Sequence, residues 1–372
     1  MATLSEQIIK NISRFAAENI ASRHDLSERD DFPHDLWKKM AESGLFKIGI
    51  EQFYGGSGGG YLNLSEAAEA LVKNGYNIGI ATSWLYQQIV ARFIIGGFGS
   101  EEQKHQLLPQ MALGKLTTSF AVSEPQRGAH PKYMTTAAIK DDSSYILTGE
   151  KTYLTNGPIA GLFIVIAVTE EGSPRHFTAF LVPRQTAGLT VGVPLKLNFL
   201  KPSPHGSIVL NNCRLPDTAI LGKEGTAYRE MVIALGEIED IVMMGTTAGA
   251  MAGQLALLIS ATGDDNIAAT EFLQVKLVEQ DEALQAIRKV VSTATECLDR
   301  GNAHSVSQAI NFMDLATEFQ SNMDAIIEKW SLQIDTRYNY LRSDLMAMMA
   351  FKKKITQLRQ AKRELELLKD KR

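Results

Sequence analysis

The hydrophobic pattern of this chain changes its period twice, and this change constrains the fold more than any single motif. Residues 1–115 carry apolar side chains at helical spacing, residues 116–222 have the pattern of short strands, and residues 223–372 return to helical spacing. Several short strands with no intervening helices are typical of antiparallel sandwiches and barrels. We therefore predict an α+β fold with an N-terminal helical domain, a middle antiparallel β domain and a C-terminal helical bundle at these boundaries.

Start signals and apolar runs define the helices of the first region. Phe32–Met40 opens one helix with a proline near its first turn, and Ile78–Ile95 predicts a buried central helix. Ser100 and Gln103 have the spacing of a capping box. Residues 55–60 hold five glycines in six positions but lack the Lys-Ser/Thr of a phosphate-binding loop and a preceding apolar strand. We expect these glycines to form a turn between helices.

The middle region predicts strands wherever β-branched and aromatic residues lie between turn-forming ones. Two polar segments, residues 141–144 and 170–174, are expected to be hairpin turns. The predicted strands are Leu116–Ser123, Thr135–Lys140, Tyr145–Leu147, Leu162–Val168, Phe177–Val182, Leu189–Val193 and Ser207–Leu210.

The last region predicts three long amphipathic helices, Leu235–Ser260, Ala268–Arg300 and Ser305–Asp344. Long helices joined by short links indicate a bundle. The final segment, Phe351–Arg372, has the pattern of a charged surface helix, with a docking role as the alternative.

Composition excludes several classes of protein. Lys and Arg number 38 against 42 Asp and Glu, giving a net charge of −4, which argues against a nucleic-acid binder. Cys213 and Cys297 are far apart and form no CxxC pair, so neither a disulfide scaffold nor a metal site is expected. The polar start argues against a signal peptide, and no apolar run of membrane-spanning length is evident. We expect a cytoplasmic protein.

Five segments, in this order, resemble motifs of the acyl-CoA dehydrogenase family. They are Phe32–Trp37 with Tyr54-Gly55-Gly56, Phe98–Lys104 with Leu108-Pro109 and Gly114-Lys115, Phe120–Pro125, Lys151–Gly157, and Asn212–Pro216 with Leu221–Gly225. The resemblance covers about residues 1–260 and implies the helical–β–helical fold. It also implies an FAD cofactor and an acyl-CoA substrate.

The resemblance places a flavin against two segments of the β domain. It implies that Phe120, Val122 and Ser123 edge the isoalloxazine ring, that Thr155 bonds near its N5, and that Tyr153 packs over it where the family usually has Trp. From the residues alone, these are ordinary strand formers.

Glu239 is the candidate catalytic base. It lies in an apolar helix that resembles the one carrying the catalytic Glu in the isovaleryl and long-chain branches of the family. Those enzymes have Arg next, whereas Asp240 follows here. The alternative is that Glu237, Glu239 and Asp240 form a solvated acidic helix start, which the helix dipole favours.

Other positions depart from the family pattern. At the substrate-binding position the family's Gly-Ser-Asp is Gly128-Ala129-His130, so Ala129 offers no hydroxyl. The loop that usually grips the FAD pyrophosphate is residues 261–266 here, and no Lys or Arg occurs from Glu230 to Val275. The family's glycine-rich loop corresponds to the glycine-free residues 330–338.

Three hypotheses about function follow from these features. The chain is a divergent dehydrogenase that uses Glu239, or a non-catalytic or half-site subunit that pairs with a flavin-bearing partner, or a structural binding module. The third leaves the flavin-strand motif unexplained. The three long amphipathic helices offer more apolar surface than one monomer readily buries, so we expect a homo-oligomer (dimer or tetramer) or a hetero-oligomer. An electron-transfer flavoprotein is a further candidate partner.

Overall fold

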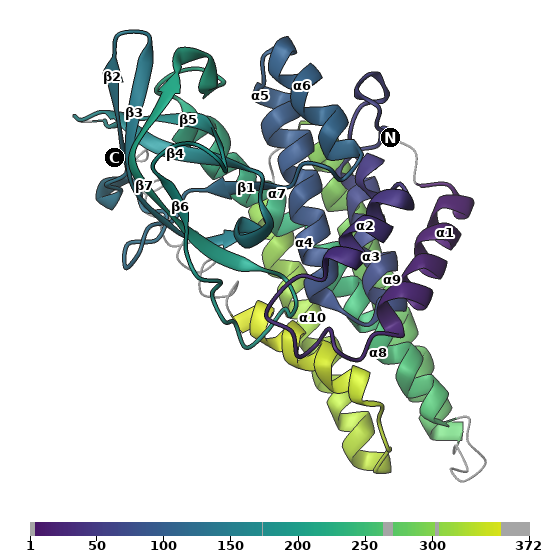
Figure 1. Cartoon of the computed structure of the whole chain (residues 1–372). Coiled ribbons are helices and arrows are strands. Elements are labelled where there is room, and N and C mark those ends of the chain that lie inside the picture. The colour runs from purple at the N-terminus through teal and green to yellow at the C-terminus, as the bar shows by residue number, and fades with distance from the viewer. Residues whose placement is uncertain (1–3, 173, 263–270, 302–304, 351–372) are drawn as a thin grey trace. The chain divides into compact units, whose positions relative to one another are not determined.

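The computed structural model describes residues 4–172, 174–262, 271–301 and 305–350. Helices come first, strands follow and helices return, as the hydrophobic pattern predicts (Figure 1). Helix α6 (Glu101–Ala112) ends before the first strand, and the last strand, β8 (Ile220–Leu221), precedes a π-helical turn η8 (Tyr228–Ile233). Element type therefore changes near residues 115 and 222, while the three domains themselves stay a prediction.

The chain groups into two compact units, each assembled from segments distant in sequence. The helical unit draws on Met1–Ser27, Tyr61–Ala81 and Asp240–Arg372, and the sheet unit on Glu28–Gly60 and Thr82–Glu239. One boundary between the two units, from Ala81 to Thr82, thus lies inside helix α4 (Ile78–Ile89).

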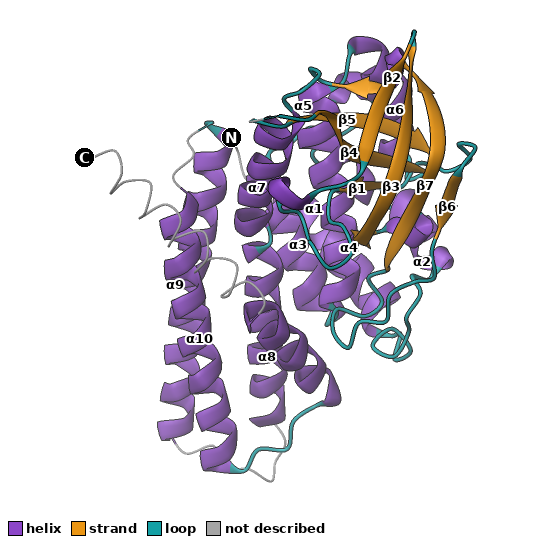
Figure 2. Cartoon of the chain, turned by 90° about the vertical axis from the view of Figure 1, so that its left-hand side faces the viewer, coloured by secondary structure: helices purple, strands orange, loops and turns teal. Residues whose placement is uncertain are grey.

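The sheet unit contains one sheet whose strands run in the order β6-β7-β3-β2-β4-β5-β8, with β1 paired to β4. Its remaining strands are β1 (Thr118–Ala121), β2 (Ala137–Asp141), β3 (Ser144–Thr155), β4 (Leu162–Glu170), β5 (His176–Pro183), β6 (Leu189–Val191) and β7 (His205–Pro216). Strands β3, β7 and β6 can be followed side by side in Figure 2.

Most strand pairs are antiparallel, as predicted, but β4 runs parallel to β1 and, at one residue pair, to β2. Residue periodicity carries no information on strand direction, so the sequence did not indicate this. Strand β3 is also much longer than the predicted Tyr145–Leu147, because it continues through Lys151–Thr155. The predicted turn after β2 is confirmed, with Asp142 at φ 54°.

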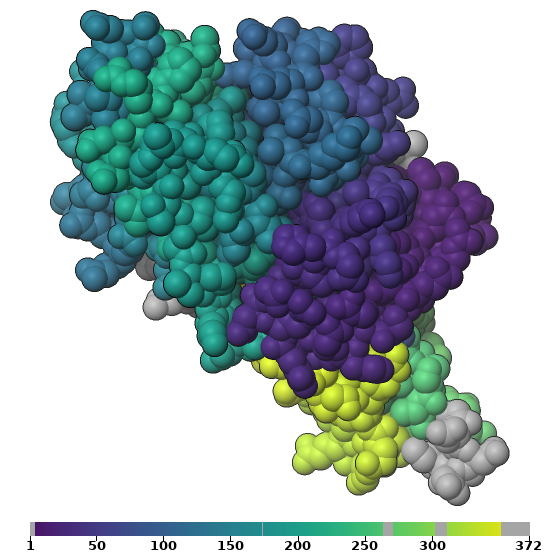
Figure 3. Space-filling model, in the orientation of Figure 1, coloured from purple at the N-terminus to yellow at the C-terminus, as the bar shows by residue number. Residues whose placement is uncertain are grey.

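Helices of the sheet unit include α2 (His34–Glu42), α4, its π-helical continuation η4 (Val90–Ile95), α5 (Gly96–Phe98) and α6. The capping box is confirmed, with Ser100 and Gln103 each bonding the other's backbone N–H. The Gln103 amide also donates to the carbonyls of Thr218 and Ile220 at 3.0 and 2.9 Å, which ties α6 to the strands. In Figure 3 the blue surface around residue 100 abuts the teal surface of the sheet.

The glycine-rich segment is a turn before helix α3 (Tyr61–Gly75), as predicted. Gly55, Gly58 and Gly59 have φ of 83°, 74° and 101°, values that L side chains rarely adopt.

The helical unit packs α1 (Glu6–Ala16), a π-helical turn η1 (Ala17–Ala21), α3, α8 (Met244–Thr262), α9 (Glu271–Asp299) and α10 (Ser305–Trp330). Small residues on α8 allow α3 to approach closely. A Cβ at Gly245 would overlap the Ser65 carbonyl oxygen, and one at Gly249 would lie 2.6 Å from that of Glu69. The glycines of this segment therefore accommodate another helix.

Two of the long predicted helices are interrupted. The predicted Leu235–Ser260 is divided at Met243 into α7 (Ala234–Val242) and α8. The predicted Ser305–Asp344 is wrong as one helix, because α10 ends at Trp330 and Ser331 takes φ 47°. A new helix covers residues 336–350 after Asp335, whose carboxylate accepts the Arg337 N–H at 2.7 Å. The predicted Phe351–Arg372 helix lies outside the described residues.

The stretch Tyr228–Thr262 is long and apolar enough to cross a membrane by length and composition. However, 89% of its most apolar window is buried within the protein, as in the core helix of a globular fold.

Candidate active site

The structure brings the five predicted flavin-edge residues together where the extension of β1 runs beside the end of β3. We call this region, residues 120–124 with 151–155, the sheet site. Thr152 N–H donates to the Ser123 carbonyl at 2.8 Å, and the Ser119 hydroxyl donates to the Thr155 carbonyl at 2.7 Å. Phe120 and Val122 are buried, whereas Ser123 and Thr155 are half-buried. The two segments therefore present one continuous edge with two hydroxyl groups.

Tyr153 has an unusual conformation at the sheet site. The register of β3 against β7 shifts between Lys151 and Leu154, and within this bulge Tyr153 takes φ 56° and is 64% exposed. A left-handed conformation costs about 1–2 kcal/mol for a residue with a Cβ. Such strain, together with an exposed aromatic ring, is typical of a ligand-binding position.

A buried ion pair beneath this edge fixes the two segments. The Lys151 ammonium donates to the Glu124 carboxylate at 3.1 Å and to the Val122 carbonyl at 2.9 Å, with side-chain exposures of 0% for Lys151 and 3% for Glu124. Glu124 also accepts hydrogen bonds from Thr135 and Thr136.

Burial alone would raise the pKa of Glu124, but the Lys151 charge and the threonine donors outweigh it and lower that pKa to about 2. Burial lowers the pKa of Lys151, and the Glu124 carboxylate opposes that shift. The motif Ser123-Glu124-Pro125 was recognised in the sequence, but its partner 27 residues away was not.

One face of α4 contacts the strands of the sheet site. The Ser83 hydroxyl donates to the Asn156 side chain at 2.5 Å, and the Asn156 amide donates back to the Ser83 carbonyl at 2.9 Å. Four residues on, the Gln87 side chain accepts the Thr118 N–H at 2.9 Å. Residues at this spacing share a helix face.

Tyr86 lies between these two residues in the sequence, and the charge of Glu239 affects its pKa. Burial raises the pKa of Tyr86 well above its usual range, and the Glu239 carboxylate adds to the shift. Glu239 itself is partly buried in α7. Ser83, Tyr86 and Gln87 lie on one face of α4, so the helix turn that bonds Asn156 also carries the tyrosine whose pKa Glu239 affects.

His205 is a residue of the site that sequence analysis missed. It opens β7 directly opposite Thr155, and its Nε2 lies 3.2 Å from the Thr155 hydroxyl oxygen. Its Nδ1 lies 3.0 Å from the Ser203 carbonyl oxygen. Fifty residues separate His205 from Thr155, so only the strand register reveals the pair.

Ala129, the predicted substrate-binding position, lies in the loop after the sheet site. Its carbonyl accepts the Tyr228 hydroxyl at 2.8 Å, and the Tyr228 ring packs 5.1 Å from that of Phe177. These contacts anchor the loop, while a role of Ala129 toward substrate stays a prediction. His130 is exposed, with its ring beside Tyr133.

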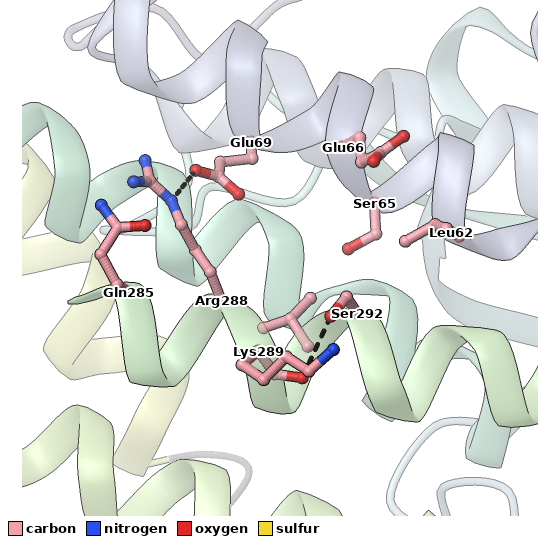
Figure 4. Close-up of a pocket in the computed structure, with 9 residues that line it drawn as sticks. Leu62, Ser65, Glu66, Glu69, Gln285, Arg288, Lys289 and Ser292 are labelled. Atoms are coloured by element: carbon pink, nitrogen blue, oxygen red, sulfur yellow. Dashed lines mark hydrogen bonds and ion pairs between the residues drawn. The ribbon is translucent and has the colours of Figure 1, made fainter. Parts of the chain in front are cut away.

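A separate pocket of about 360 Å³ lies within the helical unit, between α3 and α9 (Figure 4). None of the predicted site residues lines this helix pocket. The Arg288 guanidinium donates to Glu69 across it at 2.6 Å, with side-chain exposures of 27% and 20%. Among the residues in the described ranges, no group of three or more His, Cys, Asp or Glu is arranged to hold a metal ion.

Two family models match the chain over most of the region that forms this site. Residues 4–115 match the N-terminal domain of acyl-CoA dehydrogenases, and residues 119–213 match their middle domain. The chain belongs to the acyl-CoA dehydrogenase family.

Relatives of similar length extend this match to almost the whole chain. An acyl-CoA dehydrogenase of Bacillus subtilis (strain 168) is 28% identical over 99% of this chain and 97% of its own length. The acryloyl-CoA reductase (NADH) of Anaerotignum propionicum is 27% identical over 96% of this chain and 91% of its own. Among solved structures, butyryl-CoA dehydrogenase from Megasphaera elsdenii has the same fold, with a TM-score of 0.80, 24% identity and coverage of 96% and 95%.

The sheet site fits the ring end of a flavin as an acyl-CoA dehydrogenase would hold it. The half-buried hydroxyls of Ser123 and Thr155 would offer hydrogen-bonding groups to one edge of the ring, and the exposed Tyr153 ring would offer an aromatic surface. The pyrophosphate end cannot be placed on described residues. Of the loop expected there, Ala261 and Thr262 complete α8, and residues 263–266 lie outside the described ranges.

Proposed function

We propose that this chain is a flavin-dependent dehydrogenase that removes two hydrogens across Cα–Cβ of an acyl-CoA thioester. The observation that carries the proposal is the sheet site, where Ser123, Thr155 and the exposed Tyr153 lie on adjoining segments. The electrostatic effect of Glu239 on Tyr86, three residues after Ser83 on α4, supports the choice of base. Family membership supports the same reaction class, because relatives over nearly the full chain include acyl-CoA dehydrogenases.

In this mechanism Glu239 acts as the general base. Its carboxylate takes the α proton, and its partly buried position beside Tyr86 limits access of water. Thr155 and Ser123 orient the flavin edge, and Tyr153 covers the ring. A bound FAD would accept the β hydrogen as hydride, and an electron-transfer flavoprotein is the proposed acceptor for its electrons.

A second function, as a half-site subunit, is favoured by one feature of the sequence. No Lys or Arg occurs between Glu230 and Lys276, so this stretch offers no cationic group to the FAD phosphates. In this alternative, a partner subunit supplies the pyrophosphate contacts and the chain purified alone binds FAD weakly.

We also propose that the protein self-associates through the helical unit. Phe272, Val275 and Val278 on α9 are 52%, 52% and 58% exposed and recur every three residues. Burial of such a stripe in a dimer or tetramer would remove this apolar area from water. A monodisperse monomer at micromolar concentration in light scattering would contradict this proposal.

The test of function begins with the visible absorbance of the purified chain, with and without added FAD. Reduction of an artificial acceptor is then measured with acyl-CoAs from short to long. Glu239→Gln should lower the rate by about 10²–10⁴-fold, because the amide cannot take a proton. Asp240→Asn, the matched control one residue away, should have a milder effect.

Three outcomes separate the hypotheses. Activity in the wild type that is lost in Glu239→Gln supports the dehydrogenase with Glu239 as base. Activity kept in Glu239→Gln assigns the base to another residue. A colourless wild type that reduces nothing with added FAD, but turns yellow with a partner subunit, supports the half-site alternative.

A further inference from the structure

His205 determines the direction of the hydrogen bond made by Thr155. A backbone carbonyl only accepts hydrogen bonds, so the 3.0 Å contact with Ser203 requires the proton of His205 to be on Nδ1. A neutral imidazole carries one N–H, and Nε2 is then an acceptor. The Thr155 hydroxyl, 3.2 Å from Nε2, therefore donates its hydrogen to His205.

The surroundings keep this arrangement in place. Burial lowers the pKa of His205, which favours the neutral ring at neutral pH, although the Ser203 hydrogen bond opposes part of the shift. The backbone holds both partners, since Asn156 N–H donates to the Pro204 carbonyl at 2.8 Å and Leu195 N–H donates to the His205 carbonyl at 2.8 Å. These bonds fix the main chain on both sides of the His205–Thr155 pair.

We propose that His205 holds the Thr155 hydroxyl as a hydrogen-bond acceptor toward the flavin edge and thereby favours the reduced flavin over the oxidised one. This inference rests on the proposed function, in which N5 of a flavin lies at Thr155. Oxidised flavin has a bare N5, which needs a donor, whereas reduced flavin carries an N5–H, which needs an acceptor. With its hydrogen committed to His205, the Thr155 hydroxyl suits only the reduced form.

Two measurements test the inference, and the first needs no flavin. Nitrogen NMR of the histidine-labelled protein, assigned by comparison with His205→Phe, should show His205 as the neutral Nδ1–H tautomer. An Nε2–H tautomer would overturn the inference whether or not the protein binds FAD.

The second measurement is the reduction potential of the FAD-bound protein, equilibrated against a reference dye. His205→Phe keeps a ring but frees the Thr155 hydrogen to donate to oxidised N5. The preference for reduced over oxidised flavin should then fall by about tenfold, the size of one hydrogen bond, which corresponds to about 30 mV for a two-electron couple. Thr155→Ser keeps the hydroxyl and should keep the wild-type potential.

A double-mutant cycle measures how much the interaction between His205 and Thr155 contributes to the reduction potential. In a Thr155→Val background, His205→Phe should leave the potential unchanged, because no hydroxyl is left to orient. If His205→Phe binds FAD with the wild-type potential, or shifts the potential equally in the wild-type and Thr155→Val backgrounds, the inference is wrong. Should His205→Phe fail to fold, His205→Leu takes its place in the cycle. If no variant or wild type binds FAD, the proposed function fails, and the tautomer measurement still reports separately on the pair.

Discussion

The sheet site and the helix pocket each contain a carboxylate paired with a cation from a distant segment, but water reaches only one of the pairs. Lys151 and Glu124 are 0% and 3% exposed, and the carboxylate accepts further hydrogen bonds from two threonines. Arg288 and Glu69 are 27% and 20% exposed and line a pocket (Figure 4). Separating the buried pair would leave uncompensated charges in the interior, so this pair constrains the backbone of the two segments. The pocket pair stays partly solvated and constrains the backbone less.

The two pairs should differ most in how much stability the protein loses when one partner is removed. Lys151→Met leaves the Glu124 carboxylate buried without its counter-ion, so the free energy of unfolding should fall by about 3–5 kcal/mol. Urea denaturation measures this loss. The double variant Glu124→Gln/Lys151→Met removes both charges and should recover much of it. If the single and double variants are equally unstable, the unpaired charge of Glu124 is not the cause of the lost stability.

Acid should weaken the buried pair by a similar amount. The pKa of Glu124 falls from 4.5 to about 2 on folding, so the unfolded chain takes up the proton first. The stability that this carboxylate contributes, about 3 kcal/mol, is present above pH 4.5 and is lost as the pH falls toward 2. Urea denaturation followed from about pH 6 to about pH 2 should show a smaller loss in the double variant. If the stability of the wild type and of the double variant falls equally with pH, Glu124 is not the group responsible for the loss.

The pocket pair should matter much less. Arg288→Met should lower the free energy of unfolding by at most about 1 kcal/mol, because solvent screens the pair in the folded protein. Moderate salt should reduce the difference between wild type and variant. A loss as large as that of Lys151→Met would show that the two regions do not differ as their exposures indicate.

Substitution of Tyr153 should have the smallest effect on stability. It separates residues of the sheet site that support the fold from those that would bind the ligand. Glycine adopts φ 56° without strain, so Tyr153→Gly should change the free energy of unfolding by less than about 1 kcal/mol, in either direction. FAD titration should nevertheless show weaker binding, because the exposed ring is lost. Weaker binding together with a large loss of stability would mean that the ring supports the fold instead.

The order of helices and strands followed from periodicity alone, because each period reflects which face of a segment is buried. The lack of helices between the strands predicted antiparallel pairs, but the parallel pairing of β1 with β4 was missed, because strand direction does not affect periodicity. The break after Trp330 was also missed, since apolar residues recur on both sides and Asp335 starts a new helix without interrupting the pattern.

Motif resemblance located the strands of the sheet site but not the partners that hold them. Phe120, Ser123 and Thr155 were predicted on the strength of local motifs, and the structure brings them together. Lys151 with Glu124 and Thr155 with His205 pair across long sequence separations. A lysine in a strand pattern predicts an exposed charge, so its full burial became evident only from the register that places it beside Glu124.

The single face of α4 that carries Ser83, Tyr86 and Gln87 makes spacing as important as residue identity. Each residue turns an α-helix by about 100°, so one residue inserted between Ser83 and Tyr86 would rotate one contact away from the other. Conservative replacements at these three positions would preserve the coupling better than any change in their separation. The number of residues between Ser83 and Tyr86 therefore matters as much as their identities for keeping the Asn156 contact and the Tyr86 ring on one face of the helix.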